Sequence, residues 1–459
     1  MWKIDQLSSG LLTDLYHVDS AYVSWRTGHN EIALFDLFTR SLPFGSGYLL
    51  VAGLELAATF AREFHYRDEE IAYLQQVRPY EQAFFEDLRK TRFTGELKAI
   101  PEGEIAFANE PLIRVTAPFR EALLLEAGLL HTVSVSTLLA TKAARVVSAA
   151  GEKPVAEFAF RRAQEPFITA RSAYIGGCAS TSFLAAANQF GIPVSGTIPH
   201  ALVQAFTSEE AAFRAVAESL DNYTLLLDTY DVHRAIETAI DVAKECEPST
   251  DHRMVGVRLD SGDILADSIY VRKLLDEAGL QNVRILASGD MDEFKIARLE
   301  STGAPIDAYG VGTSIGVGAG SIEQQVDGGA LGAVYKLVSY GVGGNGARIK
   351  VAGQKSTWPG AKQVSRLDRF AGDVIHLADE RPPAGSRQLL QTVLSGGLTA
   401  ARSSPTLNEI RERAAASLAE LPEQYKRIEG AEAYPVRRSE RLVALRQRTM
   451  AEVEDDSAY

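Results

Sequence analysis

Eight short apolar segments between residues 155 and 338 constrain the fold of this chain more than any other feature. Nearly all of them end in polar side chains that can take part in chemistry. Such segments, separated by helix-length stretches, are typical of buried parallel strands in β/α units. Active sites of closed β/α barrels lie in the loops that follow the strands. We therefore expect an enzyme with a TIM-like barrel, whose strands lie in segments 155–162, 175–181, 192–200, 223–231, 254–263, 283–290, 306–313 and 333–338.

The chain has 459 residues, more than one barrel of about 200–250 residues requires. Segment 49–64 has helical periodicity, and 103–119 reads as two short strands around an Asn-Glu-Pro turn. Residues 121–147 read as one long, mostly apolar helix. We predict an α/β protein of three parts: an N-terminal α+β domain at 1–125, completed by part of 341–400, a barrel at 126–340, and a C-terminal extension of a glycine-rich hairpin and charged helices at 341–459.

Charge and cysteine content exclude several classes of protein. The net charge of −13 argues against nucleic acid and anionic membranes, which both reward a basic face. Two cysteines cannot form a disulfide framework and fit a reducing compartment. The N-terminus lacks the pattern of a signal peptide, and no apolar run is long enough to span a bilayer. We expect a cytoplasmic protein, and a small anionic substrate is compatible with this charge.

The segment GVRLDSGD carries the densest group of polar side chains at a predicted strand end. Arg258 and Asp260 lie there, where they can hold an anionic ligand, hydroxyl groups or Mg²⁺. The alternative is an N-cap formed by Asp260 or Ser261 with a neutralising arginine. Acids also follow the preceding strand, at Asp228 and Asp231, and the following strand, at Asp290. This repetition favours a functional cluster.

Glycine-rich turns follow two late strands. Gly310 to Thr313 read GVGT, and Ser288 precedes Gly289 on the neighbouring strand. Exposed backbone N–H groups in such turns bind phosphate, and loops after the late strands are the usual phosphate site of these barrels. An ordinary tight turn is the alternative, and the adjacency of the two loops favours phosphate.

Three further residues end predicted strands. Arg161 follows the first strand, where a carboxylate or polyanion is the better interpretation than a core role. His200 could be a general base, a metal ligand, a phosphoryl acceptor or a partly buried hydrogen-bonded histidine. Histidine–glutamate spacings typical of zinc sites are absent from the sequence. Lys336 could form a Schiff base, although a phosphate-facing or salt-bridged lysine is more common.

Taken together, these motifs closely resemble the nicotinate phosphoribosyltransferase family along most of the chain. The weakest stretch is the C-terminal helical tail, and the signature of type I phosphoribosyltransferases is absent. The motifs are TDLY (13–16), FDLFTRSLPFGSGYLLVAGLE (35–55), EFAFRRAQ (157–164), YIGG (174–177), GTIPH (196–200), GVRLDSGD (256–263), ASGDMDEFKI (287–296), GVGT (310–313) and PGAKQV (359–364).

The resemblance implies the first step in the salvage of nicotinate into NAD. Nicotinate and 5-phosphoribosyl 1-pyrophosphate would give nicotinate mononucleotide and pyrophosphate, with ATP as a co-substrate and Mg²⁺ as a cofactor held through substrate phosphates. It also implies an irregular β/α barrel and a homodimer whose active sites are shared between subunits.

The resemblance further assigns roles to single residues. His200 would be phosphorylated by ATP, and Arg258 and Asp260 would be the other catalytic residues, at the phosphoribosyl and Mg²⁺ region. Substrate would be bound by Tyr16 and Phe158, which would stack on the two faces of the pyridine ring, and by Arg161, Ser182, Thr197 and Asp228. The 5-phosphate would be bound by Ser288, Gly289, Asp290, Gly312 and Thr313.

Rival hypotheses are a nicotinamide- or quinolinate-using phosphoribosyltransferase, and an inactive nucleotide-binding paralogue. The nicotinamide-using relative carries an aspartate where this chain has Ser182, and that carboxylate would repel nicotinate. An inactive paralogue would have lost Arg258, Asp260 or His200, and all three are present. The chain departs from the family pattern at residues 164–166 and 198–199, which affects local loop conformation and the approach to the histidine.

Overall fold

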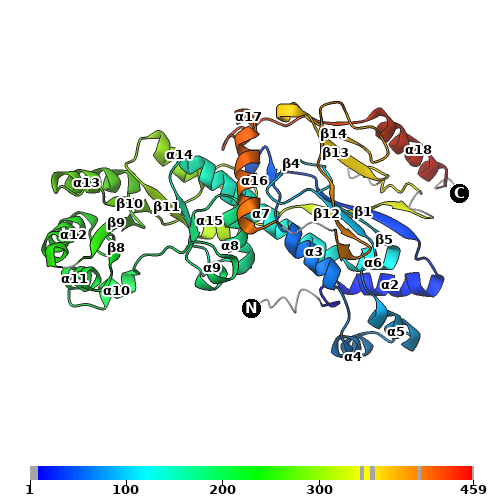
Figure 1. Cartoon of the computed structure of the whole chain (residues 1–459), viewed down its shortest axis with the longest axis horizontal. Helices are drawn as coiled ribbons and strands as arrows, with labels where there is room; N and C mark the ends of the chain where they lie inside the picture. Colours follow the sequence, from blue (N-terminus) through cyan, green and yellow to red (C-terminus); the bar gives the residue numbers. More distant parts are fainter. Residues whose placement is uncertain (1–8, 250, 342–345, 352–356, 401–404, 457–459) are drawn as a thin grey trace. The chain divides into compact units, whose positions relative to one another are not determined.

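A computed structural model describes residues 9–249, 251–341, 346–351, 357–400 and 405–456. The chain forms two compact units (Figure 1): unit 1 comprises Met1–Leu138 and Ala330–Tyr459, and unit 2 comprises Leu139–Gly329. The division falls within helix α7 (Glu126–Ala150). The predicted glycine-rich turn at 342–345 lies outside the described residues. None of the helices in the described ranges combines the length and the apolar character that a membrane span requires.

Unit 2 is built on a six-stranded parallel sheet in the order β7-β6-β11-β10-β9-β8. Its strands are β6 (Val155–Glu157), β7 (Ser180–Thr181), β8 (Asn222–Leu226), β9 (Arg253–Leu259), β10 (Arg284–Ala287) and β11 (Ala308–Val311). Its other helices are α8 (Pro166–Ile175), α9 (Leu184–Phe190), α10 (His200–Gln204), α11 (Glu209–Ser219), α12 (Val232–Cys246), α13 (Ile264–Glu277), α14 (Glu293–Ser301) and α15 (Thr313–Gly316).

The core of unit 2 lies between this sheet and its covering helices. Leu225, Val257 and Ile285 of three neighbouring strands are fully buried, together with apolar side chains of α12 and α13. Continuous apolar runs suit parallel strands that helices cover. This arrangement confirms parallel β/α units and places the carboxyl ends of all six strands along one edge.

A closed TIM-like barrel is not confirmed. Strands β7 and β8 lie at the two edges of the sheet, and segment 192–200 contributes only an isolated bridge between Thr181 and Val194. Pro193 and Pro199 lack the N–H that a ladder needs, which explains why this predicted strand is irregular. Segment 175–181 begins at the end of α8 and forms a strand only at β7.

The segment predicted as the eighth barrel strand belongs to unit 1. It forms β12 (Ala333–Tyr340), which pairs antiparallel with β1 (Ile32–Thr39) and places Lys336 opposite Asp36. The prediction was wrong because an apolar run does not specify the direction or identity of its partner strand. The proposed Schiff-base position at a barrel strand end is wrong for the same reason.

Unit 1 combines three sheets with surrounding helices. The largest has the order β12-β1-β5-β3-β16-β17, and the others are β15-β13-β14-β18 and β2-β4. The remaining strands are β2 (Leu49–Leu50), β3 (Glu96–Ala99), β4 (Ile105–Ala106), β5 (Ile113–Pro118), β13 (Lys362–Arg366), β14 (Asp373–Leu377), β15 (Arg387–Gln388), β16 (Gln391–Ser395), β17 (Leu398–Thr399) and β18 (Val436–Arg438). The helices are α2 (Leu15–Thr27), α3 (Leu54–Glu63), α4 (Asp68–Val77), α5 (Gln82–Lys90), α6 (Phe119–Leu124), α16 (Leu407–Glu420), α17 (Glu423–Lys426) and α18 (Glu440–Asp456).

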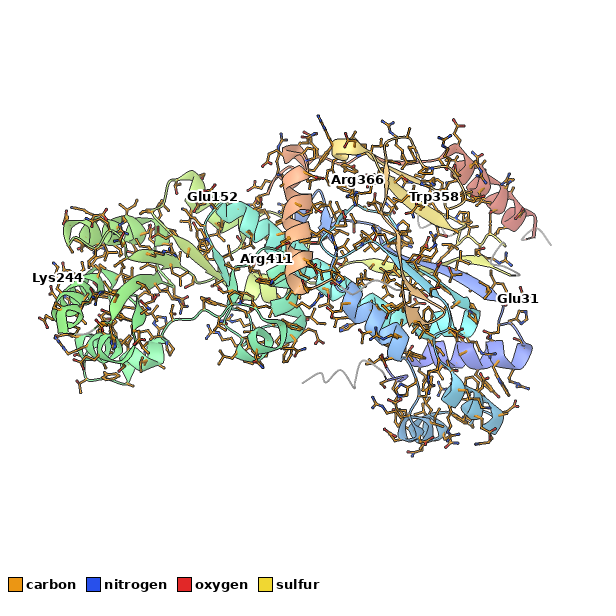
Figure 2. All side chains as sticks on the ribbon, in the orientation of Figure 1. Glu31, Glu152, Lys244, Trp358, Arg366 and Arg411 are labelled. Atoms are coloured by element: carbon orange, nitrogen blue, oxygen red, sulfur yellow. The ribbon has the colours of Figure 1, made fainter. Side chains whose placement is uncertain are left out.

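A buried charged cluster joins early and late segments of unit 1. Arg366 of β13, labelled in Figure 2, pairs with Asp373 at 2.7 Å, and the Tyr434 hydroxyl donates to the same carboxylate at 2.8 Å. Glu110 is completely buried beside them and accepts from the N–H of Phe107. Burial and the neighbouring charge of Asp373 raise the pKa of Glu110 well above its ordinary value.

Candidate active site

Arg258 is the centre of a hydrogen-bonded network at the carboxyl ends of β9 and β10. Its Nε donates to the Ser288 hydroxyl at 2.7 Å, and its Nη1 donates to the Thr197 hydroxyl at 2.9 Å. Its Nη2 lies 2.5 Å from Oδ1 of Asp260. One guanidinium therefore connects three predicted site residues that lie far apart in the sequence.

Asp260 is held in its charged form. Burial opposes ionisation, but the hydrogen bond from Ser288 at 2.5 Å and the charge of Arg258 outweigh it and lower the pKa of Asp260. The site therefore holds a fixed negative charge at neutral pH.

His200 is the first residue of α10, beside this carboxylate. Its Nδ1 lies 3.1 Å from the hydroxyl of Thr229, and its Nε2 lies 3.8 Å from Oδ2 of Asp260. The side chain is 40 % exposed, so a ligand can reach the ring. Sequence reasoning missed Thr229, although its place between two acids at the end of β8 was a usable signal.

The acids at the strand ends divide into two groups. Asp231 and Asp263 are N-caps, which accept the backbone N–H of Arg234 and Ala266 respectively. Asp228 instead accepts from the Ser261 hydroxyl at 2.5 Å, and its buried Oδ1 has no hydrogen-bond partner among the described residues. The capping role that we considered for Asp260 or Ser261 therefore belongs to Asp263.

The two glycine-rich loops follow neighbouring strands, since β10 pairs directly with β11. Gly289 has φ +80°, and a Cβ there would lie 1.6 Å from the carbonyl oxygen of Asp260. Asp290 is exposed, with φ 46°. Gly312 and Thr313 form the start of the short helix α15. The tight turn after β10 thus brings the predicted phosphate loop against the Asp260 loop.

Phe158 directly follows the carboxyl end of β6, and its ring lies near Arg258. Its ring packs on Gly310, where a Cβ would approach within 2.5 Å, and the Arg258 guanidinium lies 5.9 Å from the ring centre. Arg161 and Ser182 have exposed side chains. No hydrogen bond or ion pair found among the described residues involves the Arg161 guanidinium. Tyr16 lies on α2 of unit 1 with a side chain that is 56 % exposed, so it is not a core tyrosine.

A cavity of about 800 Å³ is lined by residues of the parallel sheet and of the loops at its two ends. Phe158, Ser195 and Thr197 line it near the carboxyl edge, while Arg253 and Arg284 line it near the other edge. Its volume is in the usual range for small-molecule sites. Phosphate-type loops, an arginine–carboxylate network and this cavity are typical of β/α enzymes that bind sugar phosphates.

Comparison with known proteins identifies the family. Residues 11–134 match the family described as nicotinate phosphoribosyltransferase N-terminal domain, and residues 382–446 match the corresponding C-terminal domain. A nicotinate phosphoribosyltransferase of Bacillus subtilis is 39% identical over 473 residues, covering 96% of this chain and 94% of that protein. One from Mycobacterium tuberculosis is 39% identical over 447 residues, with the same coverage.

The crystal structure of human nicotinic acid phosphoribosyltransferase superposes with a TM-score of 0.83 at 31% identity, covering 94% of this chain and 99% of that one. The chain therefore belongs to the nicotinate phosphoribosyltransferase family. This confirms the resemblance seen in the sequence motifs and the prediction of an enzyme.

Proposed function

We propose that this protein transfers the phosphoribosyl group of 5-phosphoribosyl 1-pyrophosphate to nicotinate, giving nicotinate mononucleotide and pyrophosphate. The Arg258 network carries the proposal, because it joins the strand ends that would hold the phosphoribosyl group in a chain related to named nicotinate phosphoribosyltransferases over nearly its full length. We further propose that the active form is a homodimer with shared sites.

The chemistry suits the charges at the site. The bond from ribose C1 to pyrophosphate breaks, with its electron pair leaving on the pyrophosphate, and the pyridine nitrogen forms the new bond to C1. Positive charge develops on the ribose during this exchange, and fixed carboxylates stabilise it. Asp260, which is ionised, and Asp228 supply that charge. The pyridine nitrogen carries no proton that must be removed, so the reaction needs no strong base.

The nicotinate ring would lie against Phe158, and Tyr16 of a second copy would cover its other face. Arg161 and Ser182 are exposed at the same edge of the sheet and are free to bind the carboxylate. Thr197, Ser288 and the loops at Gly289–Asp290 and Gly312–Thr313 would hold the ribose and its 5-phosphate. The exposed Tyr16 ring supports this arrangement, since a buried one could not contact a ligand.

The residues fit a role for Mg²⁺ bound mainly through substrate phosphates. The described residues contain no group of three or more His, Cys, Asp or Glu side chains placed to hold a metal ion. Mg²⁺ usually keeps several waters and binds one or two carboxylates plus substrate phosphates. Asp228 and Asp260 fit, because the buried Asp228 Oδ1 lacks a hydrogen-bond partner among the described residues. Such an ion would neutralise charge on the leaving pyrophosphate.

ATP coupling would act through His200. Its Nδ1 lies beside Thr229, and its Nε2, which lies near Asp260 on a partly exposed side chain, can accept a phosphoryl group. A phosphohistidine would change the charge beside the pyrophosphate and tighten substrate binding. We expect His200→Ala to abolish ATP hydrolysis and ATP stimulation while slow ATP-independent transfer continues. Normal ATP hydrolysis by this variant, with both substrates present, would contradict the phosphohistidine.

The overall function is tested with labelled nicotinate, 5-phosphoribosyl 1-pyrophosphate and Mg²⁺, with and without ATP. We expect labelled nicotinate mononucleotide in both reactions and more of it with ATP. Parallel reactions with nicotinamide and with quinolinate test the alternative substrates. Binding of nucleotide with turnover of none of the three would favour the inactive paralogue.

A further inference from the structure

Glu157 is a buried carboxylate at the carboxyl end of β6, directly before Phe158. It is 1 % exposed, and no lysine or arginine nitrogen of the described residues lies within ion-pair distance of it. One oxygen accepts the backbone N–H of Ala159, and the other accepts the Thr181 hydroxyl at 2.5 Å. Burial raises the pKa of Glu157, and these two hydrogen bonds counter the rise. Burying a carboxylate without a cation costs folding free energy. Its retention at position 157 therefore suggests a role other than stability.

Thr181 extends this contact to neighbouring segments. It is also 1 % exposed, and its hydroxyl oxygen accepts the N–H of Phe183 at 3.0 Å. Its own N–H donates to Pro193, and its carbonyl accepts from Ser195. The hydroxyl therefore donates to Glu157 of β6 and accepts from Phe183 of its own segment.

These bonds connect the segments on which the predicted pyridine-binding residues lie. The turn after Glu157 carries Phe158 and Arg161. The backbone carbonyl of Glu157 accepts the N–H of Ser182 at 3.0 Å. Ser195, bonded to Thr181, is two residues before Thr197. The two buried side chains thus bond to the turn that carries Phe158 and to the N–H that follows Ser182, while backbone bonds of Thr181 reach the segment before Thr197.

The chemistry of this pair explains why position 157 carries a glutamate. Two donors, an N–H and an O–H, face the carboxylate, and only a carboxylate offers an acceptor at both oxygens. A glutamine would accept from Ala159 and turn its NH₂ toward Thr181. The threonine hydroxyl would then receive two donors and lose its own acceptor.

We propose that Glu157 and Thr181 are positioning residues that hold Phe158, Arg161 and Ser182 in register for nicotinate. This proposal rests on the proposed function, because it assigns the pyridine ring to Phe158. The pair acts through the backbone of the binding residues and touches neither substrate.

The test uses Thr181→Val, which keeps the shape and removes the hydroxyl. We expect the KM for nicotinate to rise about tenfold or more, because the binding residues lose a hydrogen bond that orders them before nicotinate arrives, while the KM for 5-phosphoribosyl 1-pyrophosphate changes by less than about twofold. Thr181→Ser, which restores the hydroxyl, should return the KM for nicotinate to within about twofold of the unmodified value. Glu157→Gln provides the same test if Thr181→Val does not fold.

Tyr309→Phe is the matched control, since it removes another buried hydroxyl bond to a carboxylate in the same unit, from Tyr309 to Glu300 at 2.5 Å. If Thr181→Val lowers the melting temperature as Tyr309→Phe does but leaves the KM for nicotinate unchanged, the pair is only structural and the proposal is overturned. An equal rise in both KM values would also overturn it, because it would indicate general loosening.

A double-variant cycle separates this proposal from the proposed function. If Phe158 is the wall that is positioned, Thr181→Val should have little further effect on the KM for nicotinate in a Phe158→Ala background. Additive effects would contradict the positioning of Phe158. If Phe158→Ala alone leaves the KM for nicotinate unchanged, the proposed ring site fails and the positioning role fails with it. If Phe158→Ala raises this KM and Thr181→Val does not, only the positioning role fails.

Discussion

The three nitrogens of the Arg258 guanidinium each contact a different side chain, so its orientation is set before any ligand arrives. A planar donor fixed in this way positions carboxylates and hydroxyls with little loss of entropy on binding. Arg161, in contrast, is exposed and has no such partners among the described residues. In the proposed site, its guanidinium is therefore free to follow the carboxylate of nicotinate.

Substrate preference should therefore depend on the charge at position 182. Ser182 is exposed and donates its backbone N–H to Glu157. We expect Ser182→Asp to erode the preference for nicotinate over nicotinamide by at least about tenfold, because a charge-assisted hydrogen bond contributes about 1.5–3 kcal/mol. The measurement is kcat/KM for both substrates, with Ser182→Asn as an uncharged control. Equal use of both substrates by the unmodified enzyme would contradict this account.

At the scale of elements, the loop after β10 is anchored by the helix that follows it. Glu293, the first residue of α14, is completely buried between Lys142 and Arg145 of α7. Arg145 Nε lies 3.1 Å from the carboxylate, and Lys142 pairs with its other oxygen. Burial lowers the pKa of Lys142. The position of the Gly289–Asp290 turn therefore depends on a buried ion pair between two helices.

We expect Glu293→Gln to lower the free energy of unfolding by about 3–5 kcal/mol, because it leaves two buried cations without their carboxylate. Urea denaturation measures this change. Glu277→Gln, in an exposed pair with Lys273 at 3.9 Å, is the control and should change stability by less than about 0.5 kcal/mol. Similar small effects at both positions would show that the buried pair does not stabilise this region.

The sequence allowed accurate prediction of elements whose signals are local. The segments that became β6, β8, β9, β10 and β11 are mostly apolar, and the residues Arg258, Asp260 and Ser288 at their ends do meet. Which strand pairs with which depends on tertiary packing, and the sequence pattern does not specify it. The pairing of β12 with β1 and the irregular course of 192–200 were missed for that reason. Glu157 and Thr181 escaped notice because a buried carboxylate inside a strand resembles an ordinary interruption of an apolar run.

For the whole molecule, the buried cluster around Glu110 makes stability depend on pH. The pKa of Glu110 is raised by burial, so the folded state binds its proton more tightly than the unfolded state does. The contribution of protonated Glu110 to the free energy of unfolding is fully present below the pKa of about 4.3 that the group has in the unfolded chain. It is lost as the pH rises toward the pKa of the group in the folded protein. Glutamine does not titrate, so Glu110→Gln should become more stable relative to the unmodified protein as the pH rises. Urea denaturation at about pH 5, 6.5 and 8 measures it, and a difference independent of pH would contradict the raised pKa.

Shared active sites are tested by subunit exchange between two inactive variants. Tyr16→Ala would remove the ring wall and Asp260→Asn the central carboxylate, so each mixed dimer would have one site with both changes and one with neither. Random pairing makes about half of the dimers mixed, and about a quarter of all sites should recover. Activity that stays at the sum of the separate variants, despite proven exchange, would place Tyr16 within its own subunit.

The strand order of unit 1 also has a consequence for synthesis on the ribosome. Strands β1 and β3 are made early, but their neighbours β12 and β16 are made only after all of unit 2. Translation usually lets the N-terminal domain fold first. Here unit 2 can finish folding first. Until β12 and β16 are made, the early strands keep unpaired edges that can pair with strands of other chains. A ribosome that stops near residue 329 would release a complete parallel sheet attached to an unfinished one.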